Sequence, residues 1–343
     1  MFKKTALLIA ITCSSVAVQA ADRLSVVSFG GDNKVVQERA FYKPFEERER
    51  VRIEATEYNG EMAKIKVMAD TGQVAWDVVE VETPELIRGC SEGLFEKLDW
   101  PKIGKQEDFI PAAVTDCGVG IFIWSTVLTY DSSKLKGAPA SWADFWDVQK
   151  FPGKRGLRRG AKFTLEFALL ADGVKQEDLY KVLGTDEGVA RAFRKLDQLK
   201  PNIQWWEAGA QPLQWLAAGD VVMTSAYNGR VNTAQKEGRS FVIQWNGSLY
   251  DLDHWAIVKG SKNKALAEKF IAMASTAELQ KVYAEGIPYG PTNKQVNTLI
   301  NPKILADLPT APQNLENARA MDTEFWIDHG EDLEQRFNAW ASK

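Results

Sequence analysis

Residues 243–260 read IQWNGSLYDLDHWAIVKG, an apolar stretch that contains two acidic residues close together. Its alternation of side chains is typical of a β-strand, in which successive residues point to opposite faces. Asp251 and Asp253 then share a face with Trp255, while His254 lies on the opposite face. Two carboxylates on one face repel each other unless a cation lies nearby. The stretch therefore predicts a strand that is both part of the fold's centre and part of a binding site.

The start of the chain has the features of a secretory signal. A short basic region precedes a mostly apolar stretch, which ends in the small residues of Val18-Gln19-Ala20. We predict a signal peptide over residues 1–20 and a periplasmic mature protein. No later run approaches the ~20 apolar residues of a spanning helix. Cys13 leaves a lipoprotein signal as an alternative, although the apolar stretch before it is short.

Charge and cysteine content narrow the possible functions. Without Lys3 and Lys4 of the signal, 42 basic residues become 40 against 46 acidic ones, and the formal charge moves from −4 to −6. This balance gives no sign of nucleic-acid binding. Cys90 and Cys117 are then an even pair in an oxidising compartment, which makes them a disulfide candidate, with two buried free thiols as the alternative. A chain of this length usually forms two domains.

Strand and helix patterns alternate along the chain. They predict strands over 24–29, 51–56 and 76–81 with helices over 33–47 and 61–70, and then helices near 141–148, 164–172, 187–199 and 209–218 with strands near 155–159, 221–226 and 241–245. Such alternation implies two α/β domains with parallel strands. Ligands bind outside the carboxyl ends of such strands, where Gly30-Gly31-Asp32 and Glu82-Thr83 lie.

Motifs for catalysis, metals and cofactors are missing from the sequence. There is no G-x-S-x-G, H-E-x-x-H, Walker or G-x-G-x-x-G motif, and His254 and His329 are the only histidines. We therefore expect no enzymatic activity, no metal and no cofactor. Asp251, Asp253 and Glu82 leave a secreted carboxylate-based hydrolase, such as a glycosidase, as the enzymatic alternative.

Several stretches, in a fixed order, carry a resemblance to a known family. They are VVSFGGDN (26–33), WDVVEVETPELI (76–87), IWSTVLTYD (123–131), SWADFWD (141–147) followed by FPGKRGL (151–157), AYNGRVNTAQKEG (226–238), WNGSLYDLDHWAIVKGSKN (245–263) and GIPYGPTNK (286–294). Across about residues 22 to 343 the chain resembles the periplasmic solute-binding proteins of ABC importers, in the branch that includes the spermidine/putrescine-binding proteins.

The resemblance implies a two-lobed α/β fold of the Venus flytrap type (type II), with the ligand in the cleft between the lobes. One lobe would comprise residues 22–130 and 252–292, and the other residues 131–251 and 293–343. The family also implies a monomer that hands a small solute to the membrane permease of an ABC importer.

The resemblance also implies ligand contacts, residue by residue. Asp253 falls on the position of an acid that holds an ammonium group, and Asp251 on that of an aromatic residue. Tyr227, flanked by Asn228 and Arg230, stands where a tryptophan packs on the ligand's methylene chain. An aromatic face suits both a cation and an alkyl chain.

Three further expected contacts follow from the same resemblance. Glu82 and Thr83 lie where the family has small polar and aromatic contacts, and Trp124 lies in the matching IW stretch.

Two departures from the family pattern change the expected ligand. The first turn, Phe29-Gly30-Gly31, lacks at least one of the aromatic residues that clamp an amine. Arg158 and Arg159 stand where polyamine binders present acids to the far amine. Arginine repels a diamine but binds a carboxylate through two parallel hydrogen bonds. We therefore expect an ω-amino acid such as 4-aminobutyrate or 5-aminovalerate, with a polyamine such as putrescine or spermidine as the alternative.

Overall fold

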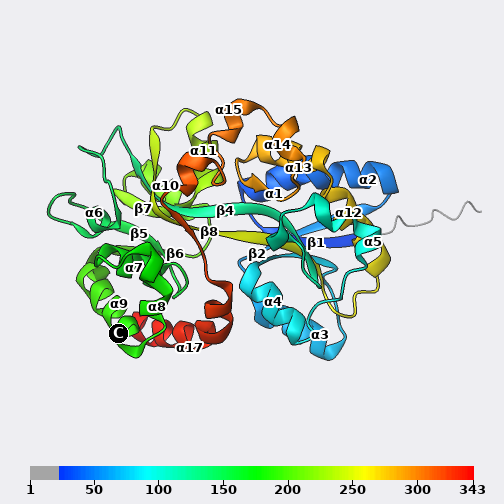
Figure 1. The fold of residues 1–343 in the computed structure, drawn as a ribbon, viewed down its shortest axis with the longest axis horizontal. Coiled ribbons are helices and arrows are strands. Elements are labelled where there is room, and N and C mark those ends of the chain that lie inside the picture. The colour runs from blue at the N-terminus through cyan, green and yellow to red at the C-terminus, as the bar shows by residue number, and fades with distance from the viewer. Residues whose placement is uncertain (1–22) are drawn as a thin grey trace, which may run out of the picture.

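The computed structural model describes residues 23–343, so the expected signal peptide over residues 1–20 lies outside the described residues. Figure 1 shows two bodies of strands and helices that are joined by two long strands, β4 and β8. We call the body that contains β1, β2 and β3 the first half, and the body that contains β5, β6 and β7 the second half.

The predicted strands are found close to their expected positions, as β1, β2, β3, β5, β7 and the start of β8, whereas β4, β6, β9 and β10 were not predicted. They are β1 Arg23–Phe29, β2 Arg52–Tyr58, β3 Val78–Glu82, β4 Gly118–Asp131, β5 Arg155–Arg158, β6 Ile203–Trp206, β7 Met223–Tyr227, β8 Phe241–Ile257, β9 Gly290–Pro291 and β10 Ala318–Ala320.

The helices cover the sheet and line the region between the halves. They are α1 Asp32–Gln37, α2 Lys43–Glu49, α3 Met62–Thr71, α4 Thr83–Ser91, α5 Trp100–Ile103, α6 Trp142–Trp146, α7 Thr164–Ala171, α8 Leu179–Leu183, α9 Asp186–Leu199, α10 Gln211–Ala218, α11 Asn228–Lys236, α12 Lys264–Ala274, α13 Ala277–Gly286, α14 Val296–Leu299, α15 Pro302–Leu305, α16 Pro312–Leu315 and α17 Thr323–Ala341. The helix predicted over 33–47 is α1 and α2 joined by a π-helical turn at Glu38–Tyr42.

One mixed sheet runs through both halves, in the order β2-β1-β3-β8-β4-β7-β5-β6. The expected parallel pairing holds within each half, where β1 pairs with β2 and β3, and β5 pairs with β6 and β7. The long strands β4 and β8 instead run antiparallel to each other and to their neighbours β7 and β3. They are therefore shared by the two halves and position residues of both around one point.

The crossing strands are buried along most of their length. All 14 residues of β4 are buried. The 17 residues of β8 can span roughly 55 Å at the usual rise of a strand. In the register, Glu82 of β3 lies opposite Asp253 of β8, and Trp124 of β4 lies opposite Asp251. The two acids of the 243–260 stretch thus lie inside the sheet, with neighbours on both sides.

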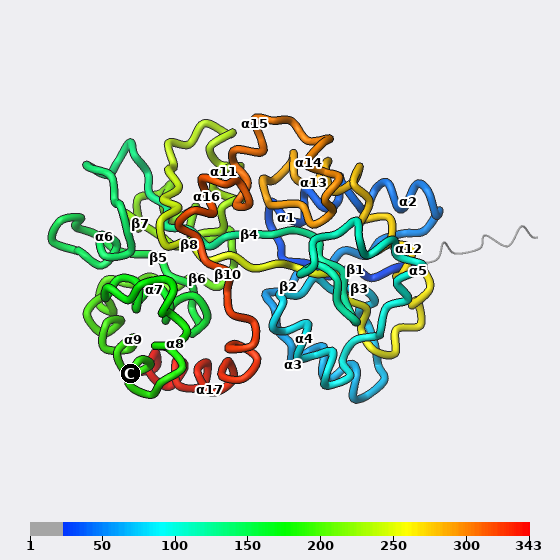
Figure 2. The backbone as a smooth tube through the Cα atoms, in the orientation of Figure 1, coloured from blue at the N-terminus to red at the C-terminus, as the bar shows by residue number. Residues whose placement is uncertain are grey.

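The C-terminal helix α17 packs on the second half and reaches toward the first. Figure 2 shows its red trace beside the green traces of α8 and α9. Glu166 of α7 is completely buried beneath it and accepts hydrogen bonds from Trp326 Nε1 at 2.8 Å and Tyr180 Oη at 3.3 Å. Burial raises the pKa of Glu166 to about 7.

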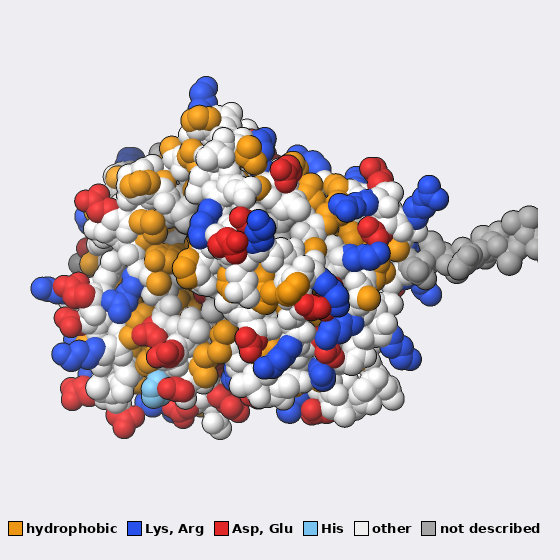
Figure 3. Space-filling model, turned by 45° about the vertical axis from the view of Figure 1, so that its right-hand side comes forward, with side chains coloured by type: hydrophobic (Ala, Val, Ile, Leu, Met, Phe, Trp, Pro, Cys, Tyr) orange, Lys and Arg blue, Asp and Glu red, His pale blue; other side chains and the backbone are white. Residues whose placement is uncertain are grey.

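The surface mixes charges of both signs. On the face seen in Figure 3, Lys and Arg side chains alternate with Asp and Glu side chains, and apolar side chains appear in small groups between them. Within residues 23–343 no helix is long and apolar enough to cross a membrane.

The predicted disulfide is confirmed: Cys90, in α4, is bonded to Cys117, which directly precedes β4. We expect the double variant Cys90→Ser/Cys117→Ser to lose about 3 to 4 kcal/mol of unfolding free energy, because the bond closes a loop with a sequence separation of 27. Urea denaturation of the oxidised protein and the variant measures this. An unchanged denaturation midpoint would contradict it.

The raised pKa of Glu166 should make the free energy of unfolding depend on pH. Its pKa is about 7 in the folded state against 4.5 unfolded, so the folded state holds a proton that unfolding releases. The unfolding free energy should therefore fall as pH rises from 4.5 through 7. Glu166→Gln, which keeps a neutral side chain, should be more stable than the wild type by up to about 3 kcal/mol at high pH.

Urea denaturation of both proteins, well below the unfolded pKa and well above the folded one, measures this difference. Glu331→Gln on the exposed surface of α17 is the matched control and should show no such pH dependence. Equal effects of Glu166→Gln at the two pH values would contradict the assignment.

Candidate functional site

A small pocket lies where β1, β3, β4, β7 and β8 meet. Its volume is about 30 Å³, and it is lined by Phe29, Asn33, Glu82, Phe122, Trp124, Tyr227, Arg230, Asp253 and Tyr289. We call it the aromatic pocket. A larger cavity of about 280 Å³ adjoins it and shares Phe29, Tyr227 and Arg230. The sheet thus brings together residues that are up to 260 positions apart in sequence, counting from Phe29 to Tyr289.

Aromatic rings form the walls of this pocket. The Trp124 and Tyr227 rings meet edge to face with centroids 5.1 Å apart, and Phe122 stacks on Tyr289 at 4.8 Å. Phe29 closes the side that belongs to the first half. Such rings cover methylene groups and attract cations through their faces. The walls therefore suit a short alkyl chain that carries an ammonium group.

Asp253 supplies an acid to the pocket, and its neighbour Glu80 controls its charge. Asp253 Oδ1 accepts a hydrogen bond of 2.7 Å from Trp124 Nε1. Burial and the nearby Glu80 carboxylate raise the pKa of Asp253 well above its usual value. Glu80 is fully buried and accepts hydrogen bonds from Asn33 Nδ2, Gln37 Nε2 and the Phe29 amide, which favour its charged form. Burial also raises the pKa of Glu80, but these hydrogen bonds oppose that shift, so we expect Asp253 to be the acid of the pair that holds the proton when no cation is bound.

Asp251 occupies a neighbouring position that is separate from the aromatic pocket. It is buried, and its Oδ2 atom has no hydrogen-bond partner among the described residues. Burial and the nearby Glu82 raise the pKa of Asp251 to about 7. It therefore contributes little negative charge below neutral pH.

Arg230 lines both the aromatic pocket and the larger cavity, and it has unpaired hydrogen-bond donors. Its side chain is 4% exposed, and Nη2 donates to the Gly30 carbonyl oxygen at 2.7 Å. Within residues 23–343, Nε and Nη1 have no hydrogen-bond partner. Gly31 has φ of 69°, and a Cβ at this position would lie 2.6 Å from Arg230 Nη1, so a glycine is required beside the guanidinium. Buried guanidinium donors of this kind suit a carboxylate.

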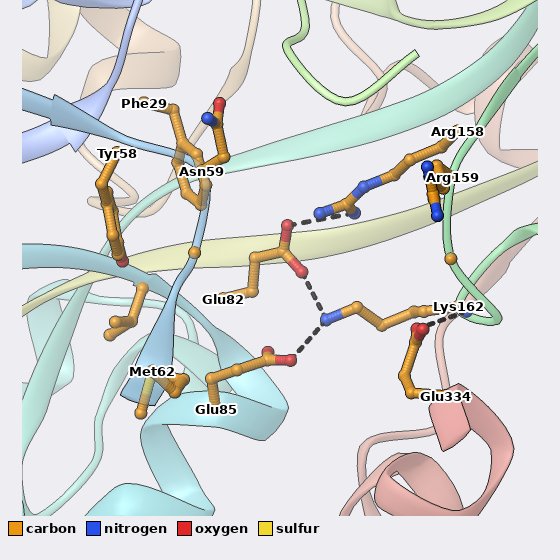
Figure 4. Close-up of a pocket in the computed structure, with 13 residues that line it drawn as sticks. Phe29, Tyr58, Asn59, Met62, Glu82, Glu85, Arg158, Arg159, Lys162 and Glu334 are labelled. Atoms are coloured by element: carbon orange, nitrogen blue, oxygen red, sulfur yellow. Dashed lines mark hydrogen bonds and ion pairs between the residues drawn. The ribbon is translucent and has the colours of Figure 1, made fainter. Parts of the chain in front are cut away.

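Glu82 belongs to a group of two acids and two cations, which we call the ion cluster: Glu82, Glu85, Arg158 and Lys162. Figure 4 shows Glu82 between the two cations. Lys162 Nζ lies 2.5 Å from Glu82 Oε2 and 2.7 Å from Glu85 Oε1, and Arg158 Nη1 lies 3.5 Å from Glu82 Oε1. Although burial opposes ionisation, Lys162 and Arg158 lower the pKa of Glu82. The cluster connects β3 and α4 of the first half to β5 and the following turn of the second half.

The residues predicted from sequence fall into two groups. Phe29, Glu82, Trp124, Tyr227 and Asp253 all line the aromatic pocket. The others lie around it, and several of them already have protein partners.

Asn228 uses its amide within the fold, since it accepts from the Ser125 amide and donates to the Pro288 carbonyl oxygen. Thr83 donates to the Leu252 carbonyl oxygen. Both side chains therefore position the crossing strands.

The two arginines expected to meet a carboxylate also have acidic partners. Arg158 pairs with Glu82, and Arg159 is half-exposed and lies 3.8 Å from Glu207 Oε1. Neither lines the aromatic pocket. Arg230, which the sequence pattern treats only as a neighbour of Tyr227, is the arginine that lines it.

Other residues of the site have weaker signals in the sequence. Glu80 could have been found, because an acid between Val79 and Val81 in an apolar strand shares a face with Glu82. Phe122 and Tyr289 look like ordinary apolar core residues in the sequence.

The histidine of the 243–260 stretch lies away from the aromatic pocket. His254 is fully buried, its Nε2 lies 3.3 Å from the Ala112 carbonyl oxygen, and burial lowers its pKa to about 4. It is therefore neutral near pH 7. Within residues 23–343 no group of three or more His, Cys, Asp or Glu side chains could hold a metal ion.

Comparison of the sequence with known proteins identifies relatives that bind small solutes, as the pocket would suggest. Residues 40–313 match the model of the bacterial extracellular solute-binding protein family. A gamma-aminobutyric acid-binding protein of Pseudomonas aeruginosa is 62% identical over 98% of this chain and 96% of its own length. A spermidine/putrescine-binding periplasmic protein of Salmonella typhimurium is 25% identical over 73% of this chain and 72% of its own length.

Solved structures show the same architecture. A GABA receptor superposes with a TM-score of 0.83 at 34% identity, covering 94% of this chain and 98% of the receptor chain. The periplasmic binding protein MotA of A. tumefaciens, in complex with glucopine, superposes with a TM-score of 0.87 at 30% identity. The match covers 93% of this chain and 99% of the MotA chain. The predicted two-lobed binding-protein fold and the predicted periplasmic location are confirmed. The chain belongs to the bacterial extracellular solute-binding protein family.

Proposed function

We propose that this protein captures an ω-amino acid, with 4-aminobutyrate as the first candidate, and delivers it to the membrane permease of an ABC importer. The observation that carries the proposal is the presence of two groups of opposite character in one aromatic pocket: the acid Asp253 and the unpaired donors of Arg230. The relative from Pseudomonas aeruginosa, named for gamma-aminobutyric acid, supports the same ligand.

The ammonium end of the ligand would bind at Asp253. There it would meet a carboxylate oriented by Trp124 Nε1 and the rings of Trp124 and Tyr227. An ammonium group loses hydration free energy when it is buried, and charged hydrogen bonds to the carboxylate recover part of it. It also replaces the proton that Asp253 otherwise holds.

The carboxylate end would bind Arg230, which takes the role expected from the sequence for Arg158 or Arg159. Nε and Nη1 of Arg230 have no hydrogen-bond partner among the described residues. They can therefore serve the carboxylate end of a zwitterion. Arg158 and Arg159 both have carboxylate partners already. The polyamine alternative is disfavoured by Arg230, because a guanidinium in the pocket repels a second ammonium.

We extend the proposal to the two lobes, residues 22–130 with 252–292 and residues 131–251 with 293–343. Contacts such as Arg230 with Gly30 and Lys162 with Glu82 join these segments, so opening the lobes would open the pocket. Small-angle scattering with and without ligand tests this, and no change in particle size would count against it.

We also propose that the protein acts as a monomer and releases its ligand unchanged. Asp253 accepts a hydrogen bond from Trp124 and Glu82 pairs with Lys162, so both acids are engaged in holding charge. Mass spectrometry of recovered ligand tests the second point, and a chemically changed ligand would favour the hydrolase alternative.

Substitution of the two charged ligand contacts should abolish most of the affinity for 4-aminobutyrate. We expect Asp253→Asn and Arg230→Met each to weaken binding about 100-fold or more, since losing one partner of a buried charge pair costs roughly 2 to 5 kcal/mol. Isothermal titration calorimetry measures this. Arg159→Ala is the matched control for Arg230→Met, because Arg159 is half-exposed and outside the aromatic pocket.

Full affinity in Arg230→Met together with a large loss in Arg159→Ala would move the carboxylate site to Arg159. A large response to diamines, with none to ω-amino acids, would instead support the polyamine alternative.

Ligand binding should release a proton in mildly acidic to neutral solution. Asp253 has a raised pKa in the free protein, and an ammonium binds its charged form. The affinity should therefore rise with pH, by up to tenfold per unit while the proton is still bound. Calorimetry in two buffers of different ionisation enthalpy counts the released protons.

Glu80→Gln should reduce this proton release, because it removes the neighbouring charge that raises the Asp253 pKa. Binding of 4-aminobutyrate to the wild type without proton release just above the ordinary pKa of an aspartate would contradict a protonated Asp253.

A further inference from the structure

The ion cluster adjoins the aromatic pocket through Glu82 and lines a second cavity. Glu82 lines the aromatic pocket, and it also lines a cavity of about 120 Å³ together with Glu85, Arg158 and Lys162. Figure 4 shows this second cavity, with Glu82 and Glu85 facing the amine of Lys162. The cluster is therefore next to the place where the ligand's ammonium end is proposed to bind.

Lys162 is held in the way that a bound amine would be held. Its Nζ atom lies 2.5 Å from one carboxylate and 2.7 Å from another, and its side chain is 10% exposed. The surrounding turn is also ordered, since Glu334 of α17 accepts hydrogen bonds from the backbone amides of Ala161 and Lys162. A buried acid, Glu82, and a partly buried one, Glu85, surround one ammonium and form a complete cation site, and the protein's own lysine occupies it.

The charges of the cluster balance with Lys162 in place. Glu82 and Glu85 carry two negative charges, and Arg158 and Lys162 carry two positive charges. Asp251, also near Lys162, has a raised pKa and carries little charge below neutral pH. A second ammonium from a ligand would therefore enter a buried region with no free negative charge, which is strongly unfavourable.

We propose that Lys162 is a specificity-determining residue: its ammonium fills a site between Glu82 and Glu85 that would otherwise accept the second ammonium of a diamine. This inference rests on the proposed function, because it assumes that the ligand's first ammonium lies at Asp253. Removing the amine of Lys162 leaves a vacant site with one unbalanced negative charge.

The vacant site would be within reach of a short diamine. Glu82 lies directly opposite Asp253 on adjacent antiparallel strands. The Cβ atoms of opposed residues are roughly 4.5 to 5.5 Å apart, and long side chains extend that reach. A diamine with one ammonium at Asp253 could therefore place the other between Glu82 and Glu85.

The test measures binding of diamines from 1,3-diaminopropane to cadaverine to the wild type and to Lys162→Met. We expect Lys162→Met to bind at least one of these diamines tenfold or more tightly than the wild type does. Lys150→Met is the matched control, because Lys150 also lies 2.7 Å from an acid, Asp144, but lines none of the cavities described above. It should leave diamine binding unchanged.

A double variant locates the new site. In Lys162→Met/Glu82→Gln the gain in diamine affinity should disappear, because the acid that holds the second ammonium is neutral. Circular dichroism and thermal melting establish that each variant is folded. Lys162→Gln, which keeps a polar side chain at this position, replaces Lys162→Met if the latter does not fold.

Three results would overturn the proposal. They are a folded Lys162 variant with no gain in diamine affinity, an equal gain in Lys150→Met, and a gain that survives Glu82→Gln.

Titration of the wild type with 4-aminobutyrate separates this inference from the proposed function. If the wild type binds 4-aminobutyrate and the Lys162 variants gain nothing, only the role of Lys162 fails. If the wild type binds no ω-amino acid, the proposed function fails.

Discussion

Burial of several carboxylates on two neighbouring strands is the constraint on which the rest of the structure depends. Glu80 and Glu82 of β3 lie beside Asp251 and Asp253 of β8, and all four are buried. Charged groups in such a place are very unfavourable unless they are neutralised, hydrogen-bonded or paired. The structure uses each solution: amide donors surround Glu80, two cations pair with Glu82, and the raised pKa of Asp253 favours its neutral form.

The way in which these charges are compensated links the pocket to the arrangement of the two halves. The cations that pair with Glu82 come from β5 and the turn after it, in the second half, and Arg230 of α11 donates to Gly30 in the first half. The ion cluster and the Arg230–Gly30 hydrogen bond therefore both connect the two halves. The groups left over in the aromatic pocket are Asp253 and the free donors of Arg230, and a zwitterion satisfies both.

Much of the fold could be predicted from local patterns. Period-two alternation and glycine turns placed β1, β2, β5 and β7 within about two residues, because these strands follow from side-chain burial on each face. The mixed direction of the sheet could not be read from alternation alone. Whether β8 pairs with β3 or with a strand at the edge of the sheet depends on contacts between distant segments. The hydrophobic periodicity of β8 would be the same in both arrangements.

Part of the pocket was predictable in the same way. Glu82 ends an apolar strand and Asp253 interrupts one, and these are local signals, whereas Phe29, Trp124 and Tyr227 were expected only from the resemblance to the family. Glu80 carries a similar signal. Phe122 and Tyr289 do not, because an aromatic residue that faces a pocket and one that faces the core have the same local pattern.

The sequence by itself indicated the export signal, the strands and helices with clear periodicity, the cysteine pair and the acids of β8, since each depends on residues close together in the chain or on composition. Only the tertiary structure decided which cation serves which acid. Arg158, Arg159 and Lys162 lie within five residues of one another, yet they pair respectively with Glu82, with Glu207, and with both Glu82 and Glu85. Arg230 keeps two donors free. Whether a charge is paired depends on distances of a few ångströms between segments far apart in sequence, and folding alone sets those distances.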